Sequence, residues 1–304
     1  MTSGDFEMHA VVLGGSGLAG ESIALVLMES GFKVSYTYFS NALEIPGAKG
    51  FRLDVSDAGA LDDFLEARKP GFVVNTVALP SVDKCDVDEE LAFKVNAEPQ
   101  RVLAGYSMRS GAAIAFMSTS NVFGPSGRPL VEDDIPGPIS AYGRTKLRGE
   151  EYTLLSKKHI ILRADQIYGW TRHGQKHTFV EKTLEKLNGG SEVEVCRDWY
   201  NCPTYAGDIA AALARLVTKG RWGVYHSVGS TYLNRYEWAL TIANVFGFDG
   251  SLVKPIDSSS LNLPAKRSNC ALSNKKITME SGVRFLSVDE GMKKMKEEEP
   301  RGRG

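Results

Sequence analysis

The chain has 304 residues, 42% hydrophobic and 24% charged, with a formal net charge of −1; this fits one large α/β domain or a nucleotide-binding domain with a smaller addition. Such a charge gives no support for nucleic acid or an anionic membrane surface as a partner, and no apolar run reaches the length that spans a bilayer. Without a secretory signal pattern or metal-ligand spacing among its five histidines and four scattered cysteines, the chain is expected to be cytoplasmic, with reduced thiols and no metal.

Apolar runs alternate with amphipathic segments through the first half of the chain. Short apolar runs ending at glycine or polar residues predict buried strands, and apolar residues three and four apart predict helices. The predicted strands are 8–14, 34–39, 50–54, 72–77, 112–118 and 160–163. The predicted helices are 21–30, 60–68 and 92–110, followed by one that begins near Ala141 with Ser140 as its cap. This alternation predicts an α/β fold with a doubly wound parallel (Rossmann) sheet.

The pattern becomes less regular after residue 164. It predicts a helix over 179–187, a strand over 192–195 and a helix over 208–218 that returns to the sheet. We expect residues 1–164, with about 206–224, to form an NAD(P)-binding Rossmann domain. Residues from about 165–205 and 225–290 are expected to form a smaller substrate-binding part. The charged segment 291–304 predicts a disordered tail.

A glycine-rich segment joins the first predicted strand to the first predicted helix. Gly14, Gly17 and Gly20 fit Gly-x-x-Gly-x-x-Gly, and Gly15 with the last two fits Gly-x-Gly-x-x-Gly. Glycines at such a turn let the backbone approach a pyrophosphate placed at a helix N-terminus. Because the segment opens a strand–helix–strand unit, it predicts dinucleotide binding.

The end of the second predicted strand decides which dinucleotide is favoured. An acid there would bind the ribose 2′-hydroxyl of NAD, but Ser40 and Asn41 occupy the position and the first carboxylate is Glu44. The missing acid removes a repulsion against a 2′-phosphate, which favours NADPH, while Ser40 or Asn41 would also serve NADH. Asp54, which ends the third strand, is either an acceptor for the adenine amino group or a cap for the next helix.

Tyr142 and Lys146 are four residues apart on the helix that is predicted to begin near Ala141. Four residues is just over one turn, so the phenol and the ammonium project from one face of the helix. A neighbouring cation lowers the pKa of a phenol and suits it to exchange a proton with a carbonyl or hydroxyl group. Alone, such a pair is more often a surface feature, but with a dinucleotide loop it predicts hydride transfer on a carbonyl or alcohol.

Further motifs extend this pattern over about residues 8–290. They are the segments 14–20, 53–55, 74–78, 82–84, 96–97, 117–123, 142–150, 162–163, 168–169, 203–204 and 223–226. In this order and spacing they resemble the extended short-chain dehydrogenase/reductase superfamily and, within it, the dTDP-4-dehydrorhamnose reductase branch. The resemblance implies cofactor contacts from Gly14, Gly17, Leu18, Gly20, Ser40, Asn41, Asp54, Val55, Val77, Ala78, Asn96, Tyr142 and Lys146.

The resemblance also implies a catalytic triad. Thr119 would hydrogen-bond the reacting oxygen, Tyr142 would deliver a proton to it, and Lys146 would lower the pKa of the tyrosine and hold the nicotinamide ribose. Hydride arriving at a carbonyl carbon places charge on the oxygen, which a positioned donor neutralises. Ser118 is the alternative hydroxyl; the resemblance favours Thr119, and strand alternation prevents both from facing the cofactor.

Departures from the branch fall where a sugar is expected to bind. Asn121 stands in place of a tyrosine and Gln166 in place of a tryptophan, and both are predicted to contact the substrate. Trp199 is predicted to line the sugar pocket, with a core or interface position as the alternative. The cations Arg172, Lys266 and Arg267 are predicted to reach a nucleotide phosphate, with a solvated surface position as the alternative.

The leading hypothesis is an NAD(P)H-dependent reductase of a 4-keto nucleotide sugar, with a homodimer as one option for its assembly. One alternative is a nucleotide-sugar 4-epimerase that uses the same triad and retains NAD. Another is a non-catalytic regulatory subunit resembling that of methionine adenosyltransferase. A dehydratase is disfavoured, because Ser120 and Asn121 stand where that class has Asp-Glu.

Overall fold

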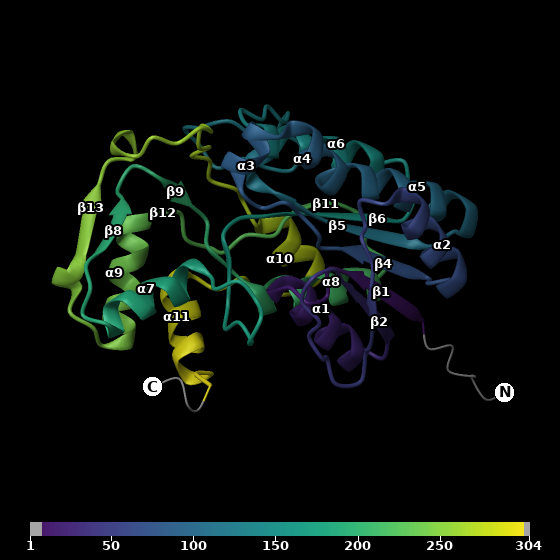
Figure 1. Ribbon diagram of the computed structural model, residues 1–304, viewed down its shortest axis with the longest axis horizontal. Helices are drawn as coiled ribbons and strands as arrows, with labels where there is room; N and C mark the ends of the chain where they lie inside the picture. The colour runs from purple at the N-terminus through teal and green to yellow at the C-terminus, as the bar shows by residue number, and fades with distance from the viewer. Residues whose placement is uncertain (1–7, 301–304) are drawn as a thin grey trace.

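A seven-stranded parallel sheet forms the larger part of the molecule in the computed structural model, which describes residues 8–300 (Figure 1). Its strands are β1 (His9–Leu13), β2 (Lys33–Tyr38), β3 (Lys49–Arg52), β4 (Phe72–Asn75), β5 (Ala113–Thr119), β6 (His159–Ala164) and β11 (Gly223–His226). The strand order is β11-β6-β5-β4-β1-β2-β3. This confirms the predicted Rossmann sheet, and the order reverses at β1, where such sheets bind ligands.

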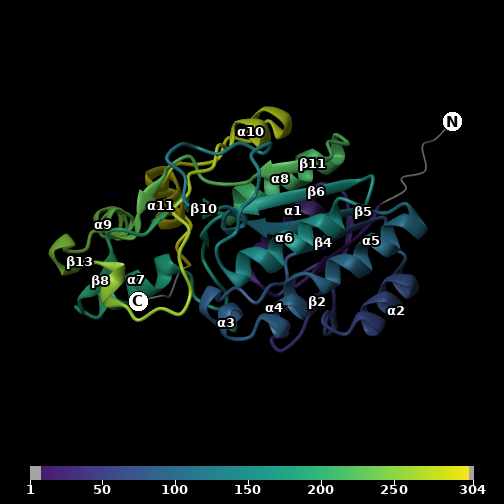
Figure 2. The same cartoon turned by 90° about the horizontal axis from the view of Figure 1, so that it is seen from above.

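Helices cover both faces of this sheet (Figures 1 and 2). One face carries α2 (Ala58–Arg68), α4 (Glu89–Asn96), α5 (Glu98–Ser110) and α6 (Ala141–Thr153), with the short α3 (Val82–Val87) at its end. The other face carries α1 (Leu18–Glu29), α8 (Ala206–Thr218) and α10 (Lys275–Ser281). Every residue of β4 and β5 is therefore buried, which explains their continuous apolar runs.

The predicted helix over 92–110 is two helices. The first, α4, ends at Asn96, and α5 begins at Glu98 with Pro99 in its first turn. Proline has no backbone N–H to donate and clashes with the preceding turn, so it is tolerated at a helix start and not in the interior. The break turns the chain after Asn96, whose side chain is buried between the helices.

The chain leaves the sheet after β6 and builds a smaller part, seen beside the sheet in Figures 1 and 2. Its elements are β7 (Ile167–Tyr168), α7 (Phe179–Asn188), β8 (Val193–Cys196), β9 (Tyr200–Asn201), β10 (Thr204–Tyr205), β12 (Leu233–Asn234), α9 (Arg235–Phe246), β13 (Val253–Ile256) and α11 (Val288–Glu297). Short strands pair as β7 with β10, β9 with β12 and β8 with β13. No helix within residues 8–300 is long and apolar enough to cross a membrane.

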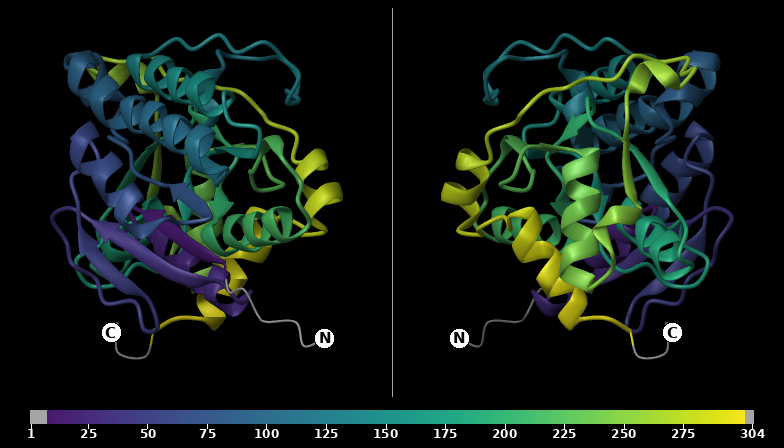
Figure 3. Two further views of the ribbon diagram at one scale, coloured as in Figure 1. Left: turned by 90° about the vertical axis from the view of Figure 1, so that its right-hand side faces the viewer. Right: turned by 90° about the vertical axis from the view of Figure 1, so that its left-hand side faces the viewer.

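The last helix, α11, occupies part of the segment that was predicted to be a disordered tail. Val288, Met292 and Met295 are buried, and α11 packs beside α9 (Figure 3). The prediction is wrong for residues 291–297, because apolar residues spaced four and three apart give this charged segment one buried face. Residues 301–304 lie outside the described part of the chain.

One helix within the expected substrate-binding segment 225–290 belongs with the sheet instead. Ile277 of α10 is fully buried in the same apolar cluster as residues of α1 and α8, and α10 contacts α8 and β11. The chain therefore returns to the sheet between α9 and α11. The local sequence of α10 predicts no packing against the sheet, because which element buries a helix face depends on tertiary contacts.

Candidate active site

A cavity of about 570 Å³ lies at the carboxyl ends of β1 to β4. This is the edge where parallel sheets of this type bind ligands. Most residues predicted to contact the cofactor line it, namely Gly14, Gly17, Leu18, Ser40, Asn41, Asp54, Val55, Val77 and Ala78. The structure thus brings the glycine loop together with the ends of three further strands.

The glycine loop has a shape that only glycine allows at two positions. Gly14 has a positive φ of 75°, and a Cβ at Gly20 would lie 2.3 Å from the Gly14 carbonyl oxygen. Gly17 caps α1 without a side-chain hydrogen bond, so the first backbone amides of α1 are available to an anion. Gly20 does not line the cavity; its lack of a Cβ lets α1 pack closely on the loop, and its predicted cofactor contact remains a prediction.

The side chain of Asn96 is held by protein groups. It is fully buried, its Oδ1 accepts from Leu79 N at 2.8 Å, and its Nδ2 donates to Thr145 Oγ1 at 3.2 Å. Asn96 does not line the cofactor cavity, and its direct contact with a cofactor remains a prediction. Asn96 instead joins the segment after Ala78 to α6.

Asp54 faces the cavity, and it is not the cap of α2. Its Oδ1 accepts from Ser56 N at 2.9 Å and from Ser56 Oγ at 2.7 Å. Asp57 caps α2, by accepting from Ala60 N at 3.0 Å. The helix-cap alternative for Asp54 is therefore wrong, and contact with the adenine remains a prediction.

The start of α6 presents Tyr142 to the end of β5. Ser140 caps the helix by accepting from Gly143 N at 3.2 Å, as predicted. A Cβ at Gly143 would lie 2.1 Å from the Asn121 carbonyl oxygen, so only glycine permits this close approach. The contact brings Tyr142 against the segment that follows Thr119.

Of the two candidate hydroxyl groups, Thr119 is the one beside Tyr142. The side chains of Thr119 and Tyr142 are hydrogen-bonded, and Asn121 Nδ2 donates to Thr119 Oγ1 at 3.1 Å. Ser118 points to the other side of the strand, where its hydroxyl donates to the buried carboxylate of Glu150. Strand alternation separates the two as expected.

Burial dominates the titration of the two predicted catalytic groups. It raises the pKa of Tyr142 to about 12, although the hydrogen bond with Thr119 acts in the opposite direction. Burial lowers the pKa of Lys146 to about 7, against the attraction of Glu150, and the ammonium position lies 4.0 Å from the Phe116 ring centroid. Burial therefore controls the pKa of Tyr142 in the protein alone, and the predicted lowering of this pKa by Lys146 remains a prediction. Tyr142 keeps its proton at neutral pH and is available as a donor.

The low pKa of Lys146 makes the stability of the fold depend on pH. Its folded-state value of about 7 lies below the ordinary 10.5, so the unfolded chain binds more protons between these values and the free energy of unfolding rises with pH. We expect the wild-type protein to gain stability relative to Lys146→Met across this window, measured by urea unfolding at several pH values. A difference that stays constant with pH would contradict this.

A buried ion pair that the sequence did not predict lies beneath the triad. Arg163 Nη2 is 2.8 Å from Glu150 Oε2, and the two side chains are 5% and 2% exposed. The carboxylate also accepts from Ser118. Glu150 is four residues after Lys146, so its charge lies on the same helix face and favours the ammonium form. This spacing was visible in the sequence and is the signal that could have identified Glu150.

A second cavity, of about 460 Å³, brings together three of the predicted substrate residues, Trp199, Lys266 and Arg267. The Arg267 guanidinium lies 4.9 Å from the Trp199 ring centroid and pairs with Asp83 at 2.5 Å. Arg267 Nε is buried and has no hydrogen-bond partner among the described residues. The cavity therefore offers an aromatic wall and cationic groups to a ligand.

Asn121 and Gln166 line neither of these two cavities. Asn121 is held on Thr119, as described above. Gln166 has a positive φ of 40°, which is unfavourable for a residue with a Cβ, and its carbonyl accepts from Thr204 N at 3.2 Å. Their predicted contact with substrate remains a prediction.

Arg172 is bonded to α1 and to the segment that follows β2. Its Nη1 donates to Glu21 Oε1 at 2.7 Å and to the Glu44 carbonyl at 3.0 Å. The loop that carries Arg172 folds back over α1, so the guanidinium is committed to protein groups there. Arg172 does not line the cavity that contains Lys266 and Arg267, and its contact with a substrate phosphate remains a prediction.

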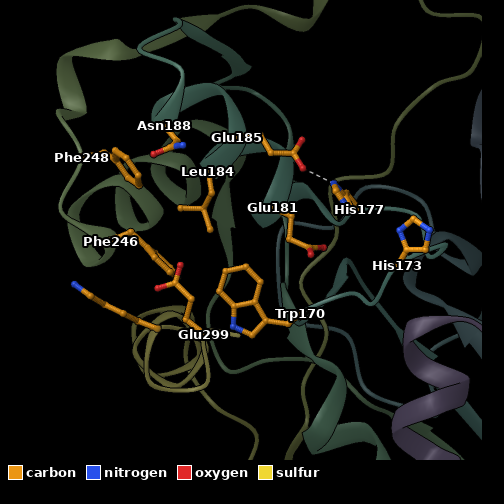
Figure 4. Close-up of a pocket in the computed structure, with 11 residues that line it drawn as sticks. Trp170, His173, His177, Glu181, Leu184, Glu185, Asn188, Phe246, Phe248 and Glu299 are labelled. Carbon is orange, nitrogen blue, oxygen red and sulfur yellow. Dashed lines mark ion pairs between the residues drawn. The ribbon is translucent and has the colours of Figure 1, made fainter. Parts of the chain in front are cut away.

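A larger cavity, of about 640 Å³, lies between α7, α9 and α11 in the smaller part (Figure 4). Its lining comprises Trp170, His173, His177, Glu181, Leu184, Glu185, Asn188, Phe246, Phe248, Lys296 and Glu299. None of the predicted site residues is among them. Its size alone therefore does not make it the candidate active site.

Comparisons with known proteins agree with this geometry. Residues 8–299 match the family described as RmlD substrate binding domain. The dTDP-4-dehydrorhamnose reductase of Aggregatibacter actinomycetemcomitans is 30% identical over 241 residues, which cover 76% of this chain and 77% of that protein. A structure titled hypothetical dTDP-4-dehydrorhamnose reductase from Sulfolobus tokodaii is 30% identical, with a TM-score of 0.83 and coverage of 93% of this chain and 99% of that one.

The fold is shared with more distant structures as well. The dTDP-4-dehydrorhamnose reductase of Bacillus anthracis, solved in complex with NADP, is 22% identical with a TM-score of 0.85 and covers 96% of this chain and 100% of that one. The family match spans nearly the whole described chain, and the resemblance to the reductase branch is confirmed. The chain belongs to the RmlD substrate binding domain family, whose relatives include proteins named dTDP-4-dehydrorhamnose reductase.

Proposed function

We propose that this protein is an NADPH-dependent reductase of a 4-keto nucleotide sugar linked to dTDP. The observation that carries the proposal is the hydrogen bond between Tyr142 and Thr119, with Lys146 one helical turn later on α6 and a cavity lined by the glycine loop nearby. Leu79, which follows the cavity residue Ala78, packs against the same cluster as Tyr142. Relatives of this chain are named for reduction of such a substrate.

The chain supplies a proton donor and the groups that position it. Bound dihydronicotinamide would supply hydride to the carbonyl carbon of the sugar. Tyr142, protonated at neutral pH because its pKa is raised, donates its proton to the carbonyl oxygen as negative charge develops there. Thr119 orients the phenol through their hydrogen bond. Lys146, when protonated, favours the phenolate that remains.

The cofactor cavity fits a dinucleotide phosphate. The uncapped N-terminus of α1 offers backbone amides to a diphosphate. Ser40 and Asn41 line the cavity at the end of β2, where an adenine ribose would bind in a sheet of this type. Without a carboxylate at these two residues, a 2′-phosphate meets no repulsion. These features support NADPH.

The cavity of Trp199 is proposed to hold the nucleotide end of the substrate. Trp199 offers a ring for stacking, and Lys266 and Arg267 offer charge to a diphosphate. This assignment supports the division into a nucleotide-binding domain and a substrate-binding part.

The test is to incubate the purified protein with NADPH and dTDP- or UDP-linked 4-keto-6-deoxyhexoses and to follow NADPH absorbance. We expect NADPH oxidation in proportion to the dTDP-linked keto sugar that is added. Conversion of sugar without net NADPH oxidation, by protein that carries bound NAD, would instead support the 4-epimerase. No conversion of any keto sugar would support the non-catalytic alternative.

A further inference from the structure

Residues 170–177, here called the strap, leave the smaller part and cross to the cofactor cavity. Asn41 Nδ2 donates to the Gly174 carbonyl at 2.8 Å, and Gln175 Nε2 donates to the Ser16 carbonyl at 3.1 Å. Ser16 belongs to the glycine loop, and Asn41 follows β2. The strap therefore touches both the diphosphate end and the adenine-ribose end of the cavity.

A single buried carboxylate anchors the strap to α1. Glu21, only 7% exposed, accepts from Arg172 Nη1 at 2.7 Å and from Gln175 Nε2 at 2.7 Å. Arg172 also donates to the Glu44 carbonyl at 3.0 Å. The charge of Arg172 is thus neutralised by Glu21 and is already used in holding the strap.

The two strap histidines face a different cavity. His173 and His177 line the cavity between α7, α9 and α11, where Figure 4 shows His177 paired with Glu185. Lys176, in contrast, lines the cofactor cavity together with Ser40 and Asn41. Of the strap's basic side chains, Lys176 is therefore the one that is placed to meet a cofactor.

Lys176 also stands out among the residues that line the cofactor cavity. Within the described chain, it is the only lysine or arginine in that lining, and Asp54 is the only carboxylate. Asp54 belongs to the segment after β3. The strap instead contacts the segment after β2, where Asn41 bonds to Gly174, two residues before Lys176. No ion pair in residues 8–300 occupies the Lys176 ammonium. A cation without a protein partner thus lies near the adenine-ribose position.

We propose that Lys176 binds the 2′-phosphate of NADPH and gives the protein its preference for NADPH over NADH. The inference rests on the proposed function for the identity of the cofactor, NADPH. It adds the residue that recognises the 2′-phosphate. The residues after β2 lack an acid, so a 2′-phosphate meets no repulsion there. The absence of repulsion does not by itself attract the phosphate. A lysine supplied by the strap gives a point charge that pairs with the phosphate.

The test compares two ligands that lack the nicotinamide and differ in the 2′-phosphate. The ligands are 2′,5′-ADP and ADP, and dissociation constants are measured by calorimetry for wild type, Lys176→Met and Lys182→Met. Lys182 is an exposed lysine on α7 and serves as the matched control. We expect Lys176→Met to weaken 2′,5′-ADP binding roughly 10- to 100-fold, with ADP binding and the control unchanged. Lys176→Arg should retain most of the 2′,5′-ADP affinity.

Three results would overturn the inference. The first is an equal loss of affinity for both ligands in Lys176→Met, which would place Lys176 on the diphosphate. The second is no loss of affinity for either ligand. The third is an equal loss of affinity for 2′,5′-ADP in the Lys182→Met control. The assay involves no keto sugar, so its outcome is separate from the proposed function. Selective loss of 2′,5′-ADP binding in a protein that reduces no keto sugar would reject the proposed function and leave Lys176 as a 2′-phosphate ligand.

Discussion

Replacement of Tyr142 by phenylalanine is expected to lower kcat for keto-sugar reduction at least about a hundredfold, the usual scale for losing a general acid. The phenol beside Thr119 is the proposed proton donor, and phenylalanine keeps the ring but removes the proton. Tyr142 does not line the cofactor cavity, so NADPH should bind with nearly unchanged affinity. Steady-state kinetics and a fluorescence titration with NADPH measure the two effects.

Tyr152 provides the matched control for this experiment. It lies on the same helix, α6, with the Arg148 guanidinium 4.5 Å from its ring centroid, and it has no contact with Thr119 in the described structure. Tyr152→Phe should leave kcat unchanged within about twofold, since it changes neither the fold nor the proton donor. Equal activity of the two variants would show that Tyr142 is not the general acid.

Replacement of Glu150 by glutamine is expected to cost about 3–5 kcal/mol of the free energy of unfolding. Glutamine has the same shape, but it leaves the Arg163 guanidinium buried and without its counter-ion. Urea unfolding followed by circular dichroism measures the loss. The double variant Glu150→Gln with Arg163→Met should recover much of it, because the unpaired charge is then removed as well.

Glu151 is the neighbouring control. Its side chain is 50% exposed and pairs with Arg148 on the surface of α6, where an ion pair contributes little. Glu151→Gln should change the free energy of unfolding by less than about 1 kcal/mol. If Glu150→Gln were as mild as this control, the buried pair would not be a main support of the site.

The sheet and the start of α6 were predictable because their signals are local. Strand runs, the glycine loop and the cap at Ser140 each act within a few residues. The break between α4 and α5 had a local signal too, in Pro99, and the buried face of α11 had one in Met292 and Met295, hidden among charged residues. These features were readable in principle from the sequence.

The position of the strap could not be predicted from local sequence signals. Arg172 meets Glu21 across 151 positions of the chain, and no local spacing encodes that contact. The sequence pattern therefore predicts a substrate-phosphate contact for Arg172 and gives no sign that the strap reaches the cofactor cavity. The raised pKa of Tyr142 could not be predicted for a related reason. The spacing from Lys146 is visible in the sequence, but the burial that controls the pKa of both groups is a property of the fold.

The most direct test of the proposed function follows the hydride itself. The protein is incubated with a dTDP-linked 4-keto-6-deoxyhexose and NADPH that carries deuterium at the transferred position, and the product sugar is examined by mass spectrometry and NMR. We expect one deuterium per product molecule, on the carbon of the former keto group, with one NADPH consumed. A product without deuterium, or no product at all, would contradict NADPH-dependent reduction.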